Sequence, residues 1–440
     1  MISSLRLAFA EEALRRRLRN IGHLLSGSLA NLLLSLPAVA LTARALGPES
    51  YGILALVLSY VQATKRFADF QVWQPIIRYG ANLDPVVDAR CLAGLYKYGV
   101  VIDAAASLAS WSLAVIGALA AHFVFGMRDT LLVAALIGSI VLLVNISGTP
   151  IAILRLNGSF RSIAYNQLVA SMVKLLLCAA AYAYGGELIA FVIIWSVTDA
   201  LAALLMMAAA YRVLRRQHLH RLDRASIAHA TCDMPGLARF TWSSNLSLTL
   251  WSSTQQLDTL LVGWLTGPTN AGLYYLVKRI SRVVQQTSQQ VQAVIFPDAA
   301  RLWAARDYRG FRRLVRQTEC ILAAFGGAMF LCFAVAGKFV IELLAGPAFQ
   351  GASMLLTVQL AALALTMPGT AMRSALLAMD EPALVLKTVL LSVAIFYATA
   401  LTLIPLIGAM GANVAQMALG VAWLSVLGTA FRRRMARLTG

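Results

Sequence analysis

The sequence predicts an all-α polytopic membrane protein of about 12 transmembrane helices, arranged as two six-helix bundles related by a parallel internal repeat. Two observations support this fold class. Hydrophobic residues make up 60% of the 440 residues and charged residues only 13%, whereas soluble domains contain about half and about a quarter. In addition, the second half of the chain loosely repeats the first, in register over 220 positions.

The repeat is clearest around two Gly-Pro pairs. Residues 43–53 (ARALGPESYGI) and 263–273 (GWLTGPTNAGL) both contain Gly-Pro, and in both a glycine follows four residues after the proline, at Gly52 and Gly272. A repeat at half the chain length indicates two halves of like architecture.

Each half contains six apolar stretches of about 20 residues or more, the length that a helix needs to cross the core of a bilayer. The stretches are residues 21–43, 51–70, 95–125, 130–154, 162–184, 188–213, 240–265, 271–296, 321–344, 352–377, 383–407 and 410–431. Six helices per half make the two repeats parallel in the membrane. A β-barrel is disfavoured because the stretches are too long and do not alternate. The predicted domains are bundles at 1–213 and 240–440, joined by a basic cytoplasmic linker at 214–239.

The formal charge of +18 is distributed as the positive-inside rule describes. Basic residues concentrate in the amino-terminal tail, in residues 212–239 and 301–316, and in the carboxyl-terminal tail, whereas the alternate loops contribute only Arg44, Arg128 and Lys338. We therefore expect both termini in the cytoplasm. The same distribution argues against nucleic acid as a partner.

The loops leave no room for an outward-facing catalytic domain. The longest, near 214–239, links the two halves, and its His218, His220 and His229 have no carboxylates placed to complete a metal site. The sequence therefore predicts no enzyme activity, no catalytic residue, no metal and no cofactor.

Ionisable residues inside membrane segments indicate function, because burying charge in a bilayer is costly. In the eighth stretch Lys278, Arg282, Gln285 and Gln289 recur at helical spacing and form one stripe, which Arg279 widens. Such a stripe faces a neighbouring helix or a wet cavity, and we favour a cavity.

The repeat brings a second polar stripe opposite the first. Moved back by 220, the positions of Arg282, Gln285, the neighbouring Gln286 and Gln289 fall on Gln62, Lys65, Arg66 and Asp69. We predict that the two stripes line a central cavity between the bundles. Lys65 and Arg66 have an equally good alternative role, ending the second helix at the cytoplasmic interface.

Asp258 and Lys278 lie about seven residues from the outward ends of consecutive helices, and therefore at similar depth. At this depth the two side chains could form a pair, which the sequence leaves open. The pair is either structural, neutralising two charges in the membrane, or part of ligand or ion coupling, for which Asp258 and Asp69 are the candidate residues.

A basic, amide-rich cavity fits an anionic ligand with a hydroxyl-rich attachment. Lysine and arginine bind phosphate, and glutamine side chains both donate to and accept from sugar hydroxyls. Hydrophobic cations would be bound by carboxylates and aromatic rings instead. A phosphate-linked glycan is the predicted ligand.

Several motifs resemble bacterial polysaccharide-export flippases, a branch of the multidrug, oligosaccharidyl-lipid and polysaccharide exporter superfamily. Residues 20–52 combine a basic start, a small and apolar first helix and the motif Ala-Arg-x-Leu-Gly-Pro-Glu-x-Tyr-Gly. Residues 258–263 (DTLLVG), followed by 271–274 (AGLY) and a basic pair, are similar to the seventh and eighth segments of that family, and 344–349 (LAGPAF) to a later turn.

The resemblance implies a multi-pass protein of the bacterial inner membrane, in which segments one, two, seven and eight line the cavity. It implies alternating access that moves an undecaprenyl-diphosphate-linked oligosaccharide to the periplasmic leaflet for O-antigen, capsule or exopolysaccharide synthesis. The cationic site of the family would fall on Lys278, Arg279 and Arg282. A polysaccharide polymerase and the chain-length machinery are candidate partners. About twelve segments, rather than fourteen, argue against a peptidoglycan precursor as the substrate.

Two other functions remain open from the sequence. One is export of drugs or small metabolites by a member of the same superfamily, which sensitivity of a deletion strain to cationic compounds would reveal. The other is a polytopic glycan polymerase or ligase, whose expected signature is a large outward loop with paired arginine, histidine or carboxylate residues. The sequence lacks such a loop.

Overall fold

The computed structural model describes residues 2–68, 72–81, 83–219, 256–379 and 381–439, together with 222, 225–227 and 237. Its side chains are described from residue 34 on, except at 125, 287–298, 300 and 437–439. Throughout these residues the regular structure is helical, without strands. Eight of the described helical spans are long and apolar enough to cross a membrane. The all-α membrane fold predicted from composition is therefore confirmed.

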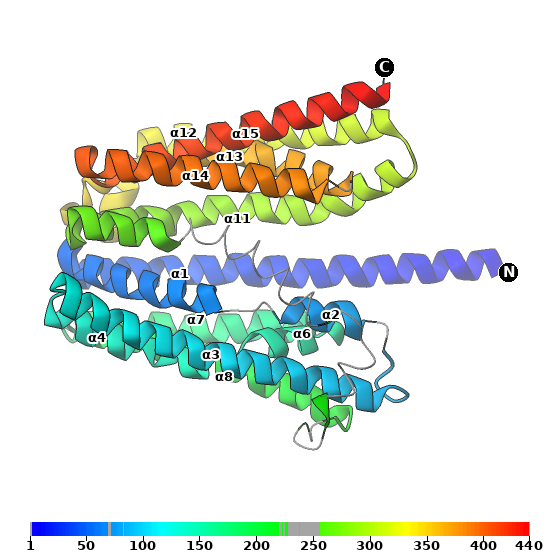
Figure 1. Ribbon diagram of the computed structural model, residues 1–440, viewed down its shortest axis with the longest axis horizontal. Helices are drawn as coiled ribbons and strands as arrows, with labels where there is room; N and C mark the ends of the chain where they lie inside the picture. Colours follow the sequence, from blue (N-terminus) through cyan, green and yellow to red (C-terminus); the bar gives the residue numbers. More distant parts are fainter. Residues whose placement is uncertain are drawn as a thin grey trace. The chain divides into compact units, whose positions relative to one another are not determined.

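The helices follow one another in the order shown in Figure 1. The first half contains α1 (Ile2–Ala68), α2 (Trp73–Gly80), α3 (Ala89–Phe125), α4 (Asp129–Ser139), α5 (Val141–Val144), α6 (Gly148–Leu156), α7 (Phe160–Ala183) and α8 (Leu188–Arg216). Residues 256–266 are helical. They precede α11 (Pro268–Ala304), α12 (Tyr308–Ala345), the 3-10 turn η2 (Pro347–Phe349), α13 (Ala352–Ala378), α14 (Pro382–Ile407) and α15 (Ala409–Thr439).

The eight candidate spans coincide with eight of the twelve predicted stretches, those that begin at residues 95 to 188 and at residues 321 to 410. The first stretch and residues 51–68 of the second lie within α1, and the eighth lies within α11. Of the seventh, only 256–265 falls among the described residues, and it is helical. The complete count of twelve and the repeat of two six-helix bundles stay predictions.

The chain divides into two compact units. The N-terminal unit comprises Met1–Ala38 and Tyr60–Thr249, and the C-terminal unit comprises Val39–Ser59 and Leu250–Gly440. Residues 39–59 of α1, called the outer turn of α1 below, therefore pack with the second half of the chain. The predicted domain boundaries at 213 and 240 stay predictions.

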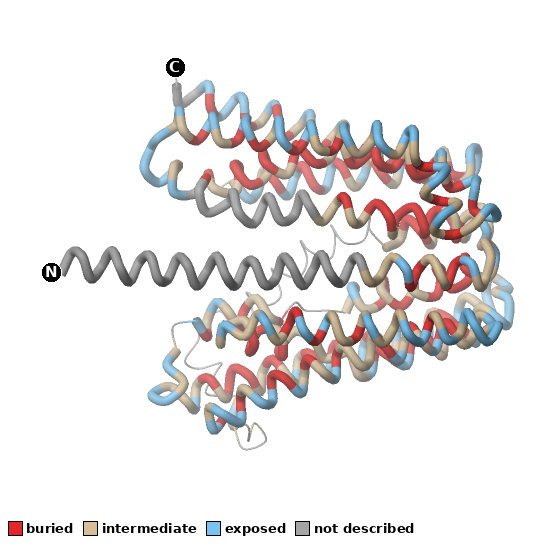
Figure 2. The backbone as a smooth tube through the Cα atoms, turned by 180° about the vertical axis from the view of Figure 1, so that it is seen from behind, coloured by how far each residue is buried: buried red, intermediate tan, exposed pale blue. Residues whose placement is uncertain are grey.

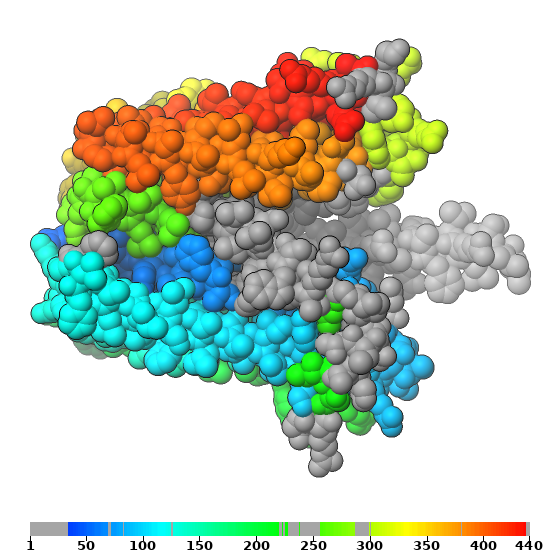
Figure 3. All heavy atoms as spheres, viewed as in Figure 1, coloured from blue at the N-terminus to red at the C-terminus, as the bar shows by residue number. Residues whose placement is uncertain are grey.

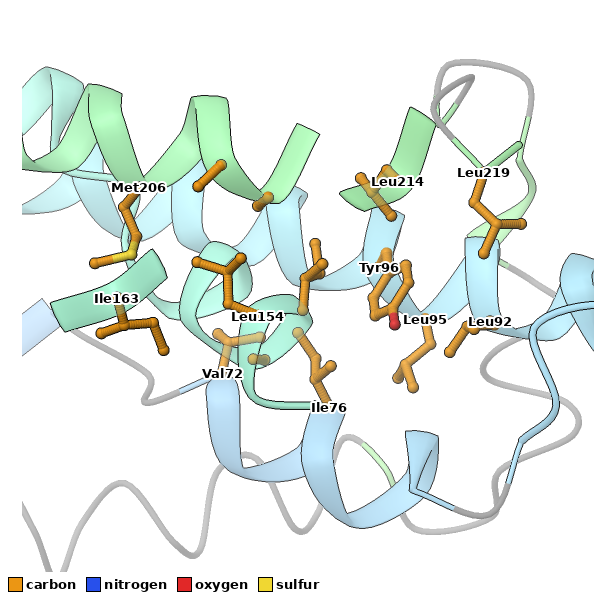
Figure 4. Close-up of a cluster of buried hydrophobic side chains, with 14 of the residues drawn as sticks. Val72, Ile76, Leu92, Leu95, Tyr96, Leu154, Ile163, Met206, Leu214 and Leu219 are labelled. Carbon is orange, nitrogen blue, oxygen red and sulfur yellow. The ribbon is translucent and has the colours of Figure 1, made fainter. Parts of the chain in front are cut away.

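In the N-terminal unit, α8 packs against α4, α5, α6 and α7, and α3 packs against α2, α4, α5 and α6. Figure 4 shows side chains of one apolar cluster in this unit, where Ile76 of α2, Leu95 of α3 and Leu154 of α6 are fully buried. This cluster anchors the short helix α2 to the longer helices.

In the C-terminal unit, α13 is the central helix and packs against α11, α12 and α15. Within each unit, Figure 2 shows buried residues on the sides of the helices that face one another and exposed residues on the outer sides. In Figure 3 the side chains of α14 and α15, in orange and red, cover one face of the C-terminal unit. The exposed residues of α12 include Leu331, Val335 and Phe339, which suits a surface in contact with lipid.

The stretch 130–154, expected as one continuous helix, is interrupted. It forms α4, α5 and α6, with residues 145–147 non-helical between the last two. Pro150 stands in the first turn of α6. It has no backbone N–H with which to bond the carbonyl four residues earlier, so a helix is weakened before this point, whereas proline is well tolerated in the first turn of a new helix. Hydropathy alone conceals this break because the residues around it are apolar.

Three turns of the C-terminal unit are made by glycine residues. Gly47 (φ 69°, ψ 174°) separates two helical arms within α1. Gly267 (φ 88°, ψ 171°) precedes α11, and Gly346 (φ 86°, ψ 176°) follows α12. This region of conformational space is open essentially to glycine alone. In each case proline follows and begins the next helix, where its fixed φ is favourable.

Gly52 of α1 and Gly272 of α11 lie at a close crossing of two helices within the C-terminal unit. A Cβ on Gly52 would overlap the carbonyl oxygen of Pro268, and a Cβ on Gly272 would overlap the carbonyl oxygen of Pro48. The contact is therefore reciprocal between the two Gly-Pro motifs noted in the sequence. Small residues permit such backbone contact, which is how helices commonly associate in membranes.

Arg44 joins the outer turn of α1 to the end of α12. Its guanidinium donates to the carbonyl oxygens of Leu343 (2.6 Å) and Leu344 (3.0 Å). These carbonyls belong to the last turn of α12, where a helix leaves its acceptors unpaired and where positive charge is favourable. Arg44, one of the few basic residues outside the basic loops, thus caps a helix.

Replacing Gly272 by alanine tests the crossing. Gly272→Ala should lower the free energy of unfolding by about 2 kcal/mol or more, because the added methyl meets backbone atoms that cannot move aside. Thermal unfolding in detergent, followed by size-exclusion chromatography, measures the loss. Gly327→Ala is the matched control, since a Cβ there has nothing within 4 Å. Equal stability of the two variants would contradict the crossing.

Candidate functional site

Asp258 and Lys278 form an ion pair inside the C-terminal unit. The Lys278 Nζ lies 2.6 Å from Asp258 Oδ1, and the two side chains are 8% and 1% exposed respectively. Asp258 lies on the helix 256–266 and Lys278 on α11, so the turn at Gly267 brings the two helices side by side. The pair, which the sequence left open, is therefore formed in the structure.

Further hydrogen bonds satisfy the carboxylate. Tyr274 donates its hydroxyl to Asp258 Oδ2 at 2.9 Å, and the backbone N–H of Thr259 donates to Oδ1 at 2.6 Å. Lys278 also donates to the Thr259 hydroxyl at 3.2 Å. Both oxygens of Asp258 thus have donors, the condition under which a buried ion pair is tolerated. The ammonium of Lys278 is therefore committed to this network in the described conformation.

Arg279 follows Lys278 on α11 and is only partly buried. Its guanidinium carbon lies 4.9 Å from the ring centroid of Tyr275, and its Nε donates to the Tyr275 hydroxyl at 3.0 Å. Tyr275 contacts Tyr51, whose ring in turn meets Phe349 edge-on at 5.8 Å between centroids. The aromatic group holds Arg279 by stacking while leaving part of the guanidinium exposed.

The other predicted ligands on α11 are Arg282 and Gln285, which are partly buried, and Gln289, whose side chain lies outside the described residues. Arg282 and Gln285 stand one and two turns beyond Lys278 on the same side of the helix. Arg279 and Arg282 are thus two arginines close to Lys278 on α11 that are neither fully buried nor paired with Asp258.

The predicted ligands on α1 lie in the N-terminal unit, near the end of the helix at Ala68. Gln62 and Lys65 are partly buried and Arg66 is exposed, while Asp69 lies outside the described residues. Lys65 lines a pocket that also contains Asp103 of α3. The binding and ion-coupling roles of all these residues stay predictions.

Single charges in the membrane stretches of the first half have partners within the protein. Lys174 Nζ lies 2.8 Å from Asp199 Oδ1 and 4.4 Å from the ring centroid of Trp195. Asp103 is partnered too, since it accepts the backbone N–H of Thr149 at 2.6 Å, and it is buried at a pocket beside the interrupted helix. The signal that would have found this interruption is Asn145 followed by Gly148 and Pro150 within an apolar stretch.

A family model described as polysaccharide biosynthesis protein matches residues 41–354. The chain belongs to this family. The match includes the outer turn of α1, the helix 256–266 and α11, and therefore the region that contains the Asp258–Lys278 pair.

Similar proteins agree with this membership. The inner membrane protein YghQ of Escherichia coli (strain K12) is 25% identical over 345 residues, which are 77% of this chain and 95% of that protein. The structure of the lipid II flippase MurJ in an inward closed conformation superposes with a TM-score of 0.72 at 11% identity, covering 94% of this chain and 89% of the other. An inward-facing multidrug resistance transporter of the MATE family gives 0.71 at 14% identity, covering 93% and 95%. This family member therefore has the fold of the MOP superfamily.

Removing one partner of the buried ion pair tests how much the pair contributes to the stability of the protein. Lys278→Met should lower the free energy of unfolding by about 3–5 kcal/mol, because it leaves a buried carboxylate without its counter-charge. Adding Asp258→Asn should recover part of that loss. Denaturation in mixed detergent measures both.

Lys174→Met is the matched control. Its partner Asp199 has a side chain that is 36% exposed, so the loss should be about 1 kcal/mol or less. A double variant at 258 and 278 that is as unstable as the sum of the single variants would show that the two side chains do not act as a pair.

Proposed function

We propose that this protein is a flippase for an undecaprenyl-diphosphate-linked oligosaccharide. It would move the repeat unit from the cytoplasmic to the periplasmic leaflet during synthesis of O-antigen, capsule or exopolysaccharide. Membership in the polysaccharide biosynthesis family and a fold shared with a lipid II flippase both support this assignment. In this proposal the protein lies in the inner membrane with both termini in the cytoplasm, where the basic loops lie.

The observation that carries the proposal is the chemistry of α11. Arg279 and Arg282 are partly exposed on a membrane helix, and Gln285 follows them. Guanidinium groups bind diphosphate oxygens through paired, charge-assisted hydrogen bonds. The amide suits the adjoining sugar hydroxyls. A lipid-linked glycan carries both groups at the point where the sugar joins its polyprenyl anchor.

The proposed cycle needs no covalent chemistry, and we assign no catalytic residue, metal or cofactor. Two bundles of six helices would alternate about a cavity lined by segments one, two, seven and eight, while the polyprenyl tail stays in lipid. The ligand shifts this equilibrium only through its different affinities for the two states. Lys278 would keep the neighbouring arginines in place through its bond to Asp258. Asp258 and Asp69 remain the proposed ion-coupling residues.

A second candidate is export of drugs or small molecules, which the shared fold with a MATE transporter favours. Hydrophobic cations bind to carboxylates and aromatic faces. On the described part of α11 the charged side chains are Lys278, Arg279, Arg282 and Arg301, all basic. The charge of this surface therefore favours an anionic ligand. Glycan polymerase or ligase activity is the weakest alternative. A polysaccharide polymerase and the chain-length machinery are the proposed partners.

A deletion strain tests the proposal. Lipid-linked single repeat units should accumulate on the cytoplasmic leaflet, inaccessible to an impermeant glycan-binding probe applied to spheroplasts. Wild-type protein should restore access. Arg282→Ala should be present in the membrane at normal level yet restore at most about a tenth of it, because loss of a charge-assisted contact in a buried site costs more than 1.4 kcal/mol.

Arg316→Gln on α12 is the matched control, since this exposed arginine lies in the same unit and outside the proposed site. It should restore access fully. Repeat units that already face outward in the deletion strain would contradict the flippase. Increased sensitivity of that strain to cationic drugs would favour the exporter instead.

A further inference from the structure

Two tyrosines of the C-terminal unit lie side by side near the crossing of α1 and α11. The rings of Tyr51 and Tyr275 are 6.1 Å apart between centroids, and the two residues are 0% and 4% exposed. Tyr51 is the neighbour of Gly52, where the two helices touch, and its ring meets Phe349 edge-on. The rings pack as apolar groups, but each one brings a hydroxyl into the interior of the unit.

Neither hydroxyl donates a hydrogen bond to any residue that the structure describes. The Tyr51 hydroxyl is buried and has no hydrogen-bond partner there. The Tyr275 hydroxyl accepts hydrogen bonds from Nε and Nη2 of Arg279, but its own hydrogen has no acceptor within the described part of the chain. A buried hydroxyl with an unused hydrogen is unfavourable, and such groups are rare in folded proteins.

Other tyrosines inside the protein show how a hydroxyl is normally satisfied. Tyr274 donates to the carboxylate of Asp258 at 2.9 Å, and Tyr60 donates to the carbonyl oxygen of Ala114 at 2.6 Å. In each case the partner is an oxygen that accepts a hydrogen bond. An acceptor is what the Tyr51–Tyr275 pair lacks.

The charges around the two hydroxyls are positive. Arg279 bonds to the Tyr275 hydroxyl, and both Arg279 and Arg282 lie near enough for their charges to act on the Tyr51 hydroxyl. Among the described residues whose charges reach Tyr51, none is acidic. Guanidinium groups donate hydrogen bonds and accept none. The group therefore combines several donors with positive charge, which is the chemistry that binds the oxygen of an anion.

We propose that the hydroxyls of Tyr51 and Tyr275, together with Arg279, bind a phosphate oxygen of the transported lipid. The unpaired hydroxyls are features of the structure, whereas the choice of phosphate rests on the proposed function. Arg279 and Arg282 are the partly exposed members of the group, so an anion meets them first. The hydroxyls then bind it when the Arg279 guanidinium moves from Tyr275 to the anion.

Tyr51→Phe tests the site, because it removes the hydroxyl and keeps the ring. In full-length protein in lipid nanodiscs, the variant should bind geranylgeranyl diphosphate at least about tenfold more weakly than wild type, since it lacks one hydrogen bond to a charged group. Without ligand it should unfold at the same temperature as wild type or at a higher one, because an unsatisfied buried group is gone. Isothermal titration calorimetry and thermal unfolding measure the two effects.

Tyr60→Phe is the matched control, since it removes from the same helix a hydroxyl that has a partner. It should unfold at a lower temperature than wild type and bind geranylgeranyl diphosphate equally well. Geranylgeraniol, which lacks the phosphates, should not distinguish wild type from Tyr51→Phe.

Competition identifies the anion. Inorganic diphosphate should displace geranylgeranyl diphosphate from wild type, and glucuronate should not. Displacement by glucuronate alone would assign the site to the carboxylate of an acidic sugar and overturn the phosphate assignment.

The results separate this inference from the proposed function. Equal affinities of wild type and Tyr51→Phe for geranylgeranyl diphosphate would overturn the tyrosine site. A lower unfolding temperature of Tyr51→Phe without ligand would overturn it too, because the hydroxyl would then have a structural partner. In both cases the proposed function would stand, since Arg279 and Arg282 would still bind the diphosphate. If wild type itself did not bind geranylgeranyl diphosphate, the proposed function would be wrong as well.

Discussion

The contact between Gly52 and Gly272 is the constraint on which the C-terminal unit depends most. Inside a membrane, apolar side chains gain little from leaving lipid, so helices associate through close packing and polar bonds. At this crossing each glycine admits the carbonyl of the other helix's proline. The same approach brings Tyr51 against Tyr275 and Phe349. Gly267, in a conformation that only glycine adopts easily, then turns the chain so that Asp258 and Lys278 meet.

The Asp258–Lys278 pair determines which positive charges of α11 are neutralised within the protein and which are not. Lys278 is buried and neutralised by Asp258, with Tyr274 and Thr259 completing the hydrogen bonds. Arg279 is held by an aromatic ring yet remains partly exposed. One stripe of basic residues in the sequence therefore contains a structural lysine and two arginines suited to an anionic ligand. In the proposed function the pair acts indirectly, because it would fix the helix that presents the arginines.

Composition and the length of the apolar stretches were sufficient to predict the all-α membrane fold, because a bilayer permits few ways of satisfying the backbone. Depth along two consecutive helices made the Asp258–Lys278 pair possible without deciding it, and the structure shows that it forms. The sequence showed the crossing of Gly52 and Gly272 only as a repeated Gly-Pro spacing, because it does not show which helices touch. The break at 145–147 was missed, because hydropathy averages over the few polar residues that make it.

The exposure of individual side chains could not be read from helical spacing either. Lys278 and Arg282 occupy the same stripe in the sequence, but one is buried against a carboxylate and the other is not. Asp103 looked like any single charge inside a membrane segment. Its position at the start of α6 follows from the packing of α3 against α6, whereas Asn145, Gly148 and Pro150 could have indicated only the break in the helix.

The central claim is that this chain alone moves a diphosphate-linked glycan across a bilayer. The most direct measurement uses purified protein in liposomes that contain an undecaprenyl-diphosphate-linked oligosaccharide, with an impermeant glycosidase added outside. If the protein is a flippase, the glycosidase should cleave nearly all of the lipid in the vesicles that contain the protein. In vesicles without the protein it should cleave only the lipid of the outer leaflet. Cleavage that stops at the level of protein-free liposomes, under both a pH gradient and a sodium gradient, would contradict the account.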